Sequence, residues 1–115
     1  MLDPKDTVRL RHMLDHAREA VSLAQSKTRS DLDQDRLLQL ALVRLIEIVG
    51  EAASRVTRET QSQYPQILWP QVIGMRNRLV HGYDSVDYNI LWQTIERDLP
   101  SLITNLQQIN TESEG

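Results

Sequence analysis

Apolar residues recur every three or four positions along most of the chain, and this period predicts α-helices rather than strands. The first such stretch follows Asp3, which can cap a helix, and Pro4, which fits the first helical position. Apolar positions continue at this spacing to Ala24, so we predict an amphipathic helix of about six turns. Residues 26–33 are mostly polar and break the period, which predicts a loop that ends in a capping Asp or Ser.

The longest apolar pattern lies in the middle of the chain and alternates steps of four and three. It consists of Leu38, Leu42, Leu45, Val49, Ala52 and Val56. A second set beside it, which includes Leu37, Leu40 and Ile46, widens the apolar face beyond one seam. The pattern therefore predicts a central helix, beginning at about residue 33, that contacts neighbours on two or more sides.

Proline and glycine mark the boundaries of the next element. Residues 61–70 form a predicted turn region, because each of its two prolines restricts the residue before it. Pro70 can then occupy the first position of a short helix over about residues 70–80. Gly82 is expected to end this helix, as glycine does just past a helix end.

A last helix is predicted to begin at Asp87, a capping residue, and Pro100 should kink or break it after Asp98. No stretch shows the alternation of period two that is typical of strands. The predicted fold is therefore all-α, an antiparallel bundle of four to five helices joined by short loops. We predict one domain over residues 1–110 and a mobile polar tail over residues 111–115.

Composition limits the partners and the chemistry of this domain. The 115 residues include 13 Lys and Arg against 16 Asp and Glu, a net charge of −3, so any contact with nucleic acid must be local. The absence of cysteine excludes a disulfide framework, cysteine-bound zinc and a thiol nucleophile. Since neither a signal peptide nor a membrane-spanning segment is visible, the expected compartment is the cytoplasm.

Two histidines, His12 and His16, lie one helical turn apart in the first predicted helix, a spacing that can chelate a metal. Glutamate does not follow His12 as it does in the HExxH pattern of zinc enzymes. We interpret both as surface or edge residues, and we predict neither a metal nor a cofactor for this domain.

The segment with the most reactive side chains lies at a predicted helix end and combines two arginines, a histidine and a tyrosine. It is the run Arg76-Asn77-Arg78-Leu79-Val80-His81-Gly82-Tyr83. Such a cluster can simply cap the helix and solvate the surface, because cations stabilise helix C-termini. It can also carry out phosphoryl transfer on RNA without a metal. His81 would then move protons, and Arg76 would stabilise charge that develops on the phosphate.

Geometry sets a condition on this second interpretation. Residues five apart on a regular helix point about 140° away from one another, so Arg76 and His81 converge only where the helix ends or distorts. Gly82 allows such an end. Since a single short site grips RNA poorly, two copies in a twofold dimer would form a better cleft. The 2′-hydroxyl of RNA can itself be the nucleophile, so no catalytic Ser, Cys or metal is required.

Acidic residues on the central helix have two interpretations. Glu47 and Glu51 lie four residues apart, and Arg44 lies three before Glu47. These residues either line the cleft and orient Arg76 or His81 through a salt bridge, or belong to the ordinary surface. In the second case they form a solvated stripe or a structural ion pair with Arg55.

Four other residues are weighed in the same way. Arg78 is either a second phosphate contact or a surface cation, and Asn77 is a possible supporting residue near the turn. Trp69 and Trp92 could stack on bases. In a helical chain without phenylalanine, however, we expect both tryptophans to fill the core or a dimer interface.

Several segments occur in a fixed order over about residues 25–103. They are Ile48-Val49-Gly50-Glu51-Ala52-Ala53, Trp69-Pro70, the run from Arg76 to Tyr83, and Asp98-Leu99-Pro100. Together they resemble the HEPN superfamily. The spacing Arg76-x4-His81-x-Tyr83 resembles the R-x4-6-H-x-Y motif of its HepT-like members, the ribonuclease toxins of the HepT/MntA toxin–antitoxin systems.

The resemblance implies a homodimeric ribonuclease toxin in which Arg76 and His81 are catalytic and face each other across the dimer cleft. It also implies a partner, a small MntA-like nucleotidyltransferase antitoxin that transfers AMP from ATP onto Tyr83. The added phosphate would compete with RNA for Arg76 and repel the incoming strand. The alternative hypothesis is a non-catalytic substrate-binding or regulatory subunit of a nucleotidyltransferase, in which the same Arg and His bind a phosphate without turning it over.

Overall fold

The computed structural model describes residues 2–81 and 85–114, and most of this backbone is helical. Three helices are long: α1 (Pro4–Ala24), α3 (Arg36–Arg55) and α8 (Leu99–Glu114). The shorter ones are α2 (Arg29–Gln34), α4 (Arg58–Gln63), α5 (Trp69–Ile73), α6 (Met75–Leu79), α7 (Tyr88–Gln93) and the π-helical turn η1 (Thr94–Asp98). Extended backbone pairs at one place in the described residues, an isolated bridge between Val80 and Val86, so the predicted all-α class is confirmed.

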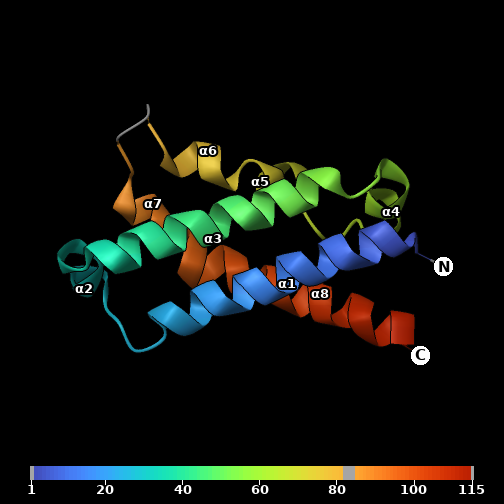
Figure 1. Ribbon diagram of the computed structural model, residues 1–115, viewed down its shortest axis with the longest axis horizontal. Coiled ribbons are helices and arrows are strands. Elements are labelled where there is room, and N and C mark those ends of the chain that lie inside the picture. Colours follow the sequence, from blue (N-terminus) through green and yellow to red (C-terminus); the bar gives the residue numbers. More distant parts are fainter. Residues whose placement is uncertain (1, 82–84, 115) are drawn as a thin grey trace.

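The long helices pack in an antiparallel arrangement (Figure 1). Helices α1 and α3 lie side by side and run in opposite directions, and α8 lies behind them in this view and contacts α1. Helices α5 and α6 contact α3 along the edge opposite to α1. Helix α3 is therefore the central helix, as its wide apolar pattern predicts.

The main apolar stripe of α3 forms the middle of the core. Its buried members are Leu38, Leu42, Leu45, Val49, Ala52 and Val56. The prediction for the flanking set is only partly right: Ile46 is buried, but Leu37 and Leu40 are 79% and 51% exposed. Within the described chain no helix covers the face of α3 on which these two leucines lie.

The loop predicted over residues 26–33 is wrong in part, because α2 occupies Arg29–Gln34. Its start is a capping box, in which the Asp31 N–H donates to Thr28 Oγ1 (3.1 Å) and the Thr28 N–H donates to the Asp31 carboxylate (2.8 Å). Leu32 of this helix is buried in the core. The capping box and one buried leucine suffice to form such a short helix. Hydrophobic periodicity did not predict it, because the pattern needs a longer stretch of residues to become visible.

The predicted break near Pro100 is confirmed, and it takes the form of a π-helical turn. Asp87 caps α7, as predicted, by accepting two backbone N–H groups. The helix then widens into η1 (Thr94–Asp98), and Pro100 lies in the first turn of α8, where proline is tolerated. Helix α8 continues to Glu114, so residues 111–114, predicted as a tail beyond the bundle, have helical backbone.

A buried carboxylate joins α1 to the start of α4. Asp6 accepts hydrogen bonds from the Thr57 hydroxyl (2.6 Å), the Thr57 N–H (3.1 Å) and the Thr60 hydroxyl (2.7 Å), and Arg9 lies 3.5 Å away. Burial by itself raises the pKa of Asp6. The hydrogen bonds from the two threonines and the charge of Arg9 outweigh it, so the pKa is lowered from its ordinary value of 3.8. The ionised carboxylate thus fixes the turn between α3 and α4.

Gly50 allows α5 to approach the central helix closely. A Cβ atom at this position would lie 3.2 Å from the carbonyl oxygen of Ile73 and 3.4 Å from that of Val72. Both oxygens belong to the backbone of α5, so they can retreat only if the helix itself moves. Since α6 follows α5 after one residue, this contact also sets the position of α6.

We expect Gly50→Val to lower the free energy of unfolding by about 1–3 kcal/mol, the usual cost of overpacking a close contact. The measurement is the shift of the urea midpoint at an unchanged slope. Ser54→Val is the matched control, because it places the same β-branched side chain on an exposed position of the same helix. Equal stability of the two variants would contradict the close approach.

Candidate functional site

The short helix predicted over residues 70–80 is divided at Gly74 into α5 and α6. At Gly74 the backbone has φ −89° and ψ 2°, which departs from regular helical values, although its N–H still donates to the Pro70 carbonyl (3.0 Å). Helix α6 ends at Leu79, before the predicted stop at Gly82, which lies outside the described residues. The turn region predicted over residues 61–70 begins too early, because helix α4 extends to Gln63.

Helix α6 carries three of the predicted site residues. Met75 and Leu79, four residues apart, are buried and fix α6 to the core. The residues between them, Arg76, Asn77 and Arg78, are exposed. The order of apolar and polar residues in α6 therefore directs both guanidinium groups toward solvent.

Arg76 reaches across to the central helix. Its Nε donates to Glu47 Oε2 at 2.8 Å, and Arg44, one turn earlier on α3, donates to the other carboxylate oxygen of Glu47. The hydrogen bond from Arg44 has the largest effect on the pKa of Glu47, and with the bond from Arg76 it outweighs burial. The pKa of Glu47 is therefore lowered from its ordinary value of 4.5, and the ionised carboxylate is shared by two guanidinium groups.

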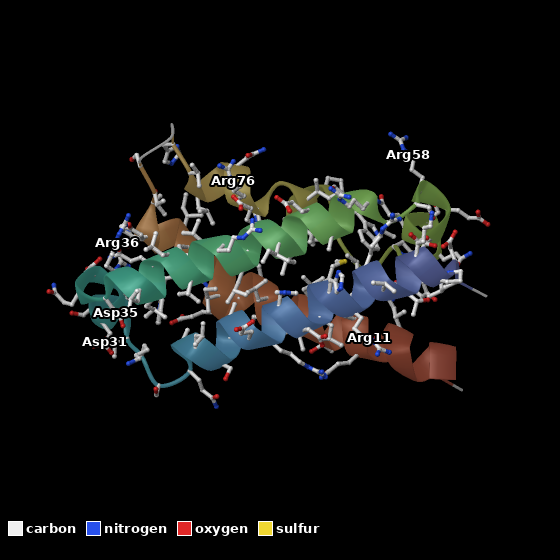
Figure 2. All side chains as sticks on the ribbon, viewed as in Figure 1. Arg11, Asp31, Asp35, Arg36, Arg58 and Arg76 are labelled. Atoms are coloured by element: carbon white, nitrogen blue, oxygen red, sulfur yellow. The ribbon has the colours of Figure 1, made fainter. Side chains whose placement is uncertain are left out.

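Arg76 retains donors for an anion while it is held in this way. Its side chain is 47% exposed, and its hydrogen bond within the described chain uses Nε. Figure 2 shows the side chain at the outer edge of the molecule, on the side away from Arg11. The two terminal amino groups can therefore donate to two oxygens of one phosphate, the bidentate geometry that guanidinium groups favour.

A shallow groove of about 320 Å³ lies beside Arg76. It is lined by Glu47, Gly50, Glu51, Ser54, Ile73, Arg76 and Asn77. Of the two predicted acidic residues, Glu47 contacts a predicted catalytic side chain and Glu51 shares the groove with it. The alternative of an ion pair with Arg55 does not occur among the described residues, where the Arg55 carbonyl accepts from Arg9 (2.6 Å).

His81 lies just past the end of α6, at the base of a short reversal of the chain. Its N–H donates to the Ser85 carbonyl (2.6 Å), and the Asp87 N–H donates to the Leu79 carbonyl (2.7 Å). The imidazole is exposed. Tyr83 lies outside the described residues, so its predicted role stays a prediction.

A second groove, of about 500 Å³, lies on the other side of α6 and contains His81. Its lining residues are Gln71, Asn77, Arg78, His81, Ile90, Gln93, Thr94, Arg97 and Asp98. Arg76 belongs to the first groove and His81 to the second, so one copy of the chain does not bring the two side chains into a common groove.

The second groove also contains a residue that sequence reasoning missed. Arg97 comes from η1 and is exposed beside His81 and Arg78. Arg78 lies 3.5 Å from Asp98, the neighbour of Arg97, and forms a weak ion pair with it. Pro100, three residues later, predicts an irregularity in the helix at this point. Because irregular helical turns often occur at functional sites, this irregularity was the sequence feature that could have indicated Arg97.

The two tryptophans differ in their surroundings. Trp69 is buried, and its indole N–H donates to the carbonyls of Gln61 and Tyr64 (both 3.1 Å), so it is a structural residue, as expected. Trp92 is half-buried and packs against the core. The core therefore covers each indole ring at least in part, and neither ring is fully free to stack on a base.

His12 and His16 pack their rings edge to face, with centroids 6.1 Å apart, and His16 Nδ1 lies 2.7 Å from the His12 carbonyl oxygen. No group of three or more possible metal ligands occurs in the part of the chain that the structure describes. In the same residues, no helix is long and apolar enough to cross a membrane.

An all-helical chain with this arginine–histidine segment on a short helix beside a central one belongs to the HEPN class of proteins. Within that class, this chain belongs to the HepT-like family. The model of that family, described as ribonuclease HepT-like, matches residues 13–109.

Relatives of known name are similar over most of their length. A "probable ribonuclease HepT" of Thermococcus cleftensis is 36% identical over 93 residues, which are 77% of this chain and 84% of the relative. A "putative RNase" of Caldanaerobacter subterraneus subsp. tengcongensis is 31% identical over 100 residues, 87% of this chain and 89% of the relative. Another of Methanocaldococcus jannaschii is 27% identical over 114 residues, 97% and 94% of the two chains. No solved structure matches the chain.

Proposed function

We propose that this chain is a metal-independent endoribonuclease, with Arg76 and His81 as its catalytic residues. The observation that carries the proposal is the state of Arg76, which Glu47 holds through Nε (2.8 Å) while the side chain stays 47% exposed and its terminal amino groups make no hydrogen bond within the described residues. A cation held in this way is preorganised to stabilise charge on a phosphate. The names of the relatives, ribonuclease HepT and RNase, favour RNA as the substrate.

The reaction follows from the groups that are present. The 2′-hydroxyl oxygen of the RNA attacks the adjacent phosphorus as His81 removes its proton, and the bond from phosphorus to the 5′-oxygen breaks. The leaving oxygen takes up a proton, and the products are a 2′,3′-cyclic phosphate and a 5′-hydroxyl. Arg76 stabilises the negative charge of the phosphate oxygens throughout.

A twofold homodimer would complete the site. Arg76 and His81 line different grooves of one chain, so a second copy would be needed to place these two side chains on the same phosphate. The uncovered face of α3 favours this assembly. It carries the exposed Leu37 and Leu40 and leads along the same helix to Glu47 of the site.

The proposed biological role is that of a cytoplasmic toxin, which an MntA-like nucleotidyltransferase inactivates by transferring AMP from ATP to Tyr83. Tyr83 follows His81 by two residues in the sequence. Each AMP unit adds a phosphate near His81, and this phosphate competes with RNA for the arginines of the site.

One experiment with two preparations tests this function. Protein expressed alone should cut labelled RNA in the presence of EDTA and leave 2′,3′-cyclic ends. Protein expressed together with the nucleotidyltransferase should be inactive and carry AMP on Tyr83, as measured by intact mass and peptide mapping. Tyr83→Phe is the control, because it should stay active and unmodified in both preparations.

RNA that is bound but never cut by the unmodified protein would contradict the ribonuclease and favour a regulatory subunit of the nucleotidyltransferase. Cutting that stops in EDTA would contradict the metal-free mechanism. Cutting by an unmodified protein in both preparations would leave the ribonuclease in place and overturn the AMP-transfer step.

A further inference from the structure

The groove that contains His81 continues into a smaller and more enclosed cavity. This cavity, of about 250 Å³, lies between the segment before α5 and the start of α8. The two hollows share three lining residues, Gln71, Arg97 and Asp98. A chain that binds at His81 can therefore reach the cavity by passing Arg97.

Arg97 is the free cation at this junction. It is exposed, and the described residues provide it with neither a hydrogen bond nor an ion pair. Arg78 is also 41% exposed, and its distance of 3.5 Å to Asp98 leaves most of its donors available. Two guanidinium groups thus flank the path between His81 and the cavity, an arrangement that suits a phosphate.

The cavity itself has an apolar floor and a polar rim. Val72, Met75 and Leu102 are buried and form the floor. The rim carries side-chain amides and a hydroxyl, from Gln66, Gln71, Ser101 and Asn105. Asn105 uses its amide nitrogen to donate to the Gln66 carbonyl (3.3 Å). Its own carbonyl oxygen remains available as an acceptor.

A nucleobase matches this chemistry. Its faces are apolar and flat, while its edges carry hydrogen-bond donors and acceptors that amide side chains can pair with. Sequence-selective RNA recognition commonly places an unstacked base in such a pocket.

We propose that the cavity binds the base of an RNA nucleotide adjacent to the cut phosphate, and that Arg78 and Arg97 bind the phosphate of that nucleotide. This inference rests on the proposed ribonuclease function and assigns it a specificity site. The site lies in the groove of His81 and the cavity beside it, which share only Asn77 with the groove of Arg76 and Glu47.

The phosphate contact is tested by the salt dependence of binding. The probe is single-stranded 2′-O-methyl RNA, which cannot be cut because it lacks a free 2′-hydroxyl. Arg97→Gln should weaken binding at low salt and reduce the slope of log K against log salt by about 0.7, the value for one lost contact to a single strand. Arg11→Gln is the matched control, because this exposed arginine of α1 (Figure 2) lines neither the groove nor the cavity, and it should leave the slope unchanged.

The base contact is tested by filling the cavity. Ser101→Trp adds bulk at the rim, and Thr104→Trp adds the same bulk to an exposed position three residues later that does not line the cavity. Against homopolymers of 2′-O-methyl A, C, G and U, the native protein and Thr104→Trp should show the same base preference. In Ser101→Trp the ratio of the strongest to the weakest affinity should fall toward one.

The outcomes separate this inference from the function on which it rests. If both test variants behave like their controls while the native protein still cuts RNA, the base site is wrong and the ribonuclease stands. If the variants respond as expected but the native protein never cuts RNA, the base site is supported and the ribonuclease is wrong. If the native protein shows no base preference, the proposed site is overturned.

Discussion

Replacing Arg76 with alanine should lower the rate of RNA cleavage by about two to three orders of magnitude, the usual loss when one preorganised donor to a developing charge is removed. His81→Ala should lower it by about two to four orders, as expected for the loss of a general base. In the proposed mechanism both side chains act on the same phosphate, so the double variant should be little slower than the slower single variant. Growth arrest on expression alone should be lost in all three variants.

The fold should survive these changes. Arg76 and His81 are both exposed, and the ion pair of Arg76 with Glu47 is a surface interaction, so the free energy of unfolding should change by less than about 1 kcal/mol. Single-turnover cleavage in EDTA gives the rates, and urea unfolding gives the stabilities. Arg58→Ala is the matched control, since Arg58 is exposed on α4, away from Arg76 (Figure 2).

Two results would refute this assignment. One is an Arg76→Ala protein that cuts RNA as fast as Arg58→Ala. The other is a double variant whose loss is the product of the two single losses, because independent effects would mean that Arg76 and His81 do not act together on one phosphate.

The second large effect concerns stability. Asp6→Asn should lower the free energy of unfolding by about 3 kcal/mol at neutral pH. The amide cannot accept all the hydrogen bonds that Thr57 and Thr60 donate, and its NH₂ group brings a donor to a site already filled with donors. Asp15→Asn is the control, because Asp15 is an exposed carboxylate on the same helix.

The effect of Asp6 depends on pH in a direction that the structure fixes. Its pKa in the folded state is lowered from 3.8, so the folded state favours the ionised form. The resulting stability is fully present above the unfolded pKa and is lost as the pH falls through the lower folded value. The difference in urea midpoint between the native protein and Asp6→Asn should therefore shrink below pH 3.8 and stay constant above it. A difference that is independent of pH would contradict the role of the charge.

The parts of the fold that the sequence predicts well are those where one strong local signal suffices. The stripe on α3, the Asp3–Pro4 start of α1, the Asp87 cap and the break near Pro100 each depend on residues that lie within a turn or two of each other. Helix α2 and the division at Gly74 were missed because short helices are decided by single caps and by packing. Leu37 and Leu40 were expected to contact a neighbouring element, because a wide apolar pattern does not reveal which side is left uncovered.

The same distinction applies to the candidate site: its local features could be predicted from the sequence, and its tertiary contacts could not. The run from Arg76 to His81 is local, so its spacing alone draws attention to it. The pairing of Arg76 with Glu47 joins residues 29 apart in sequence, and the sequence offered it only as one of two interpretations. Arg97 lies on a different helical turn from every residue of the motif, and its place beside His81 follows from tertiary packing, which no spacing rule contains.

Arg76 and His81 line different grooves of one chain, and the two-copy site proposed from this has a kinetic consequence. A reaction centre that needs side chains from two copies is assembled by a bimolecular step, so its activity rises with the square of the protein concentration while dimers are scarce. Trace synthesis would then be harmless, and damage to RNA would begin steeply above a threshold set by the dissociation constant of the dimer. The short helix would in this way give the cell a dose-dependent switch that requires no additional regulator.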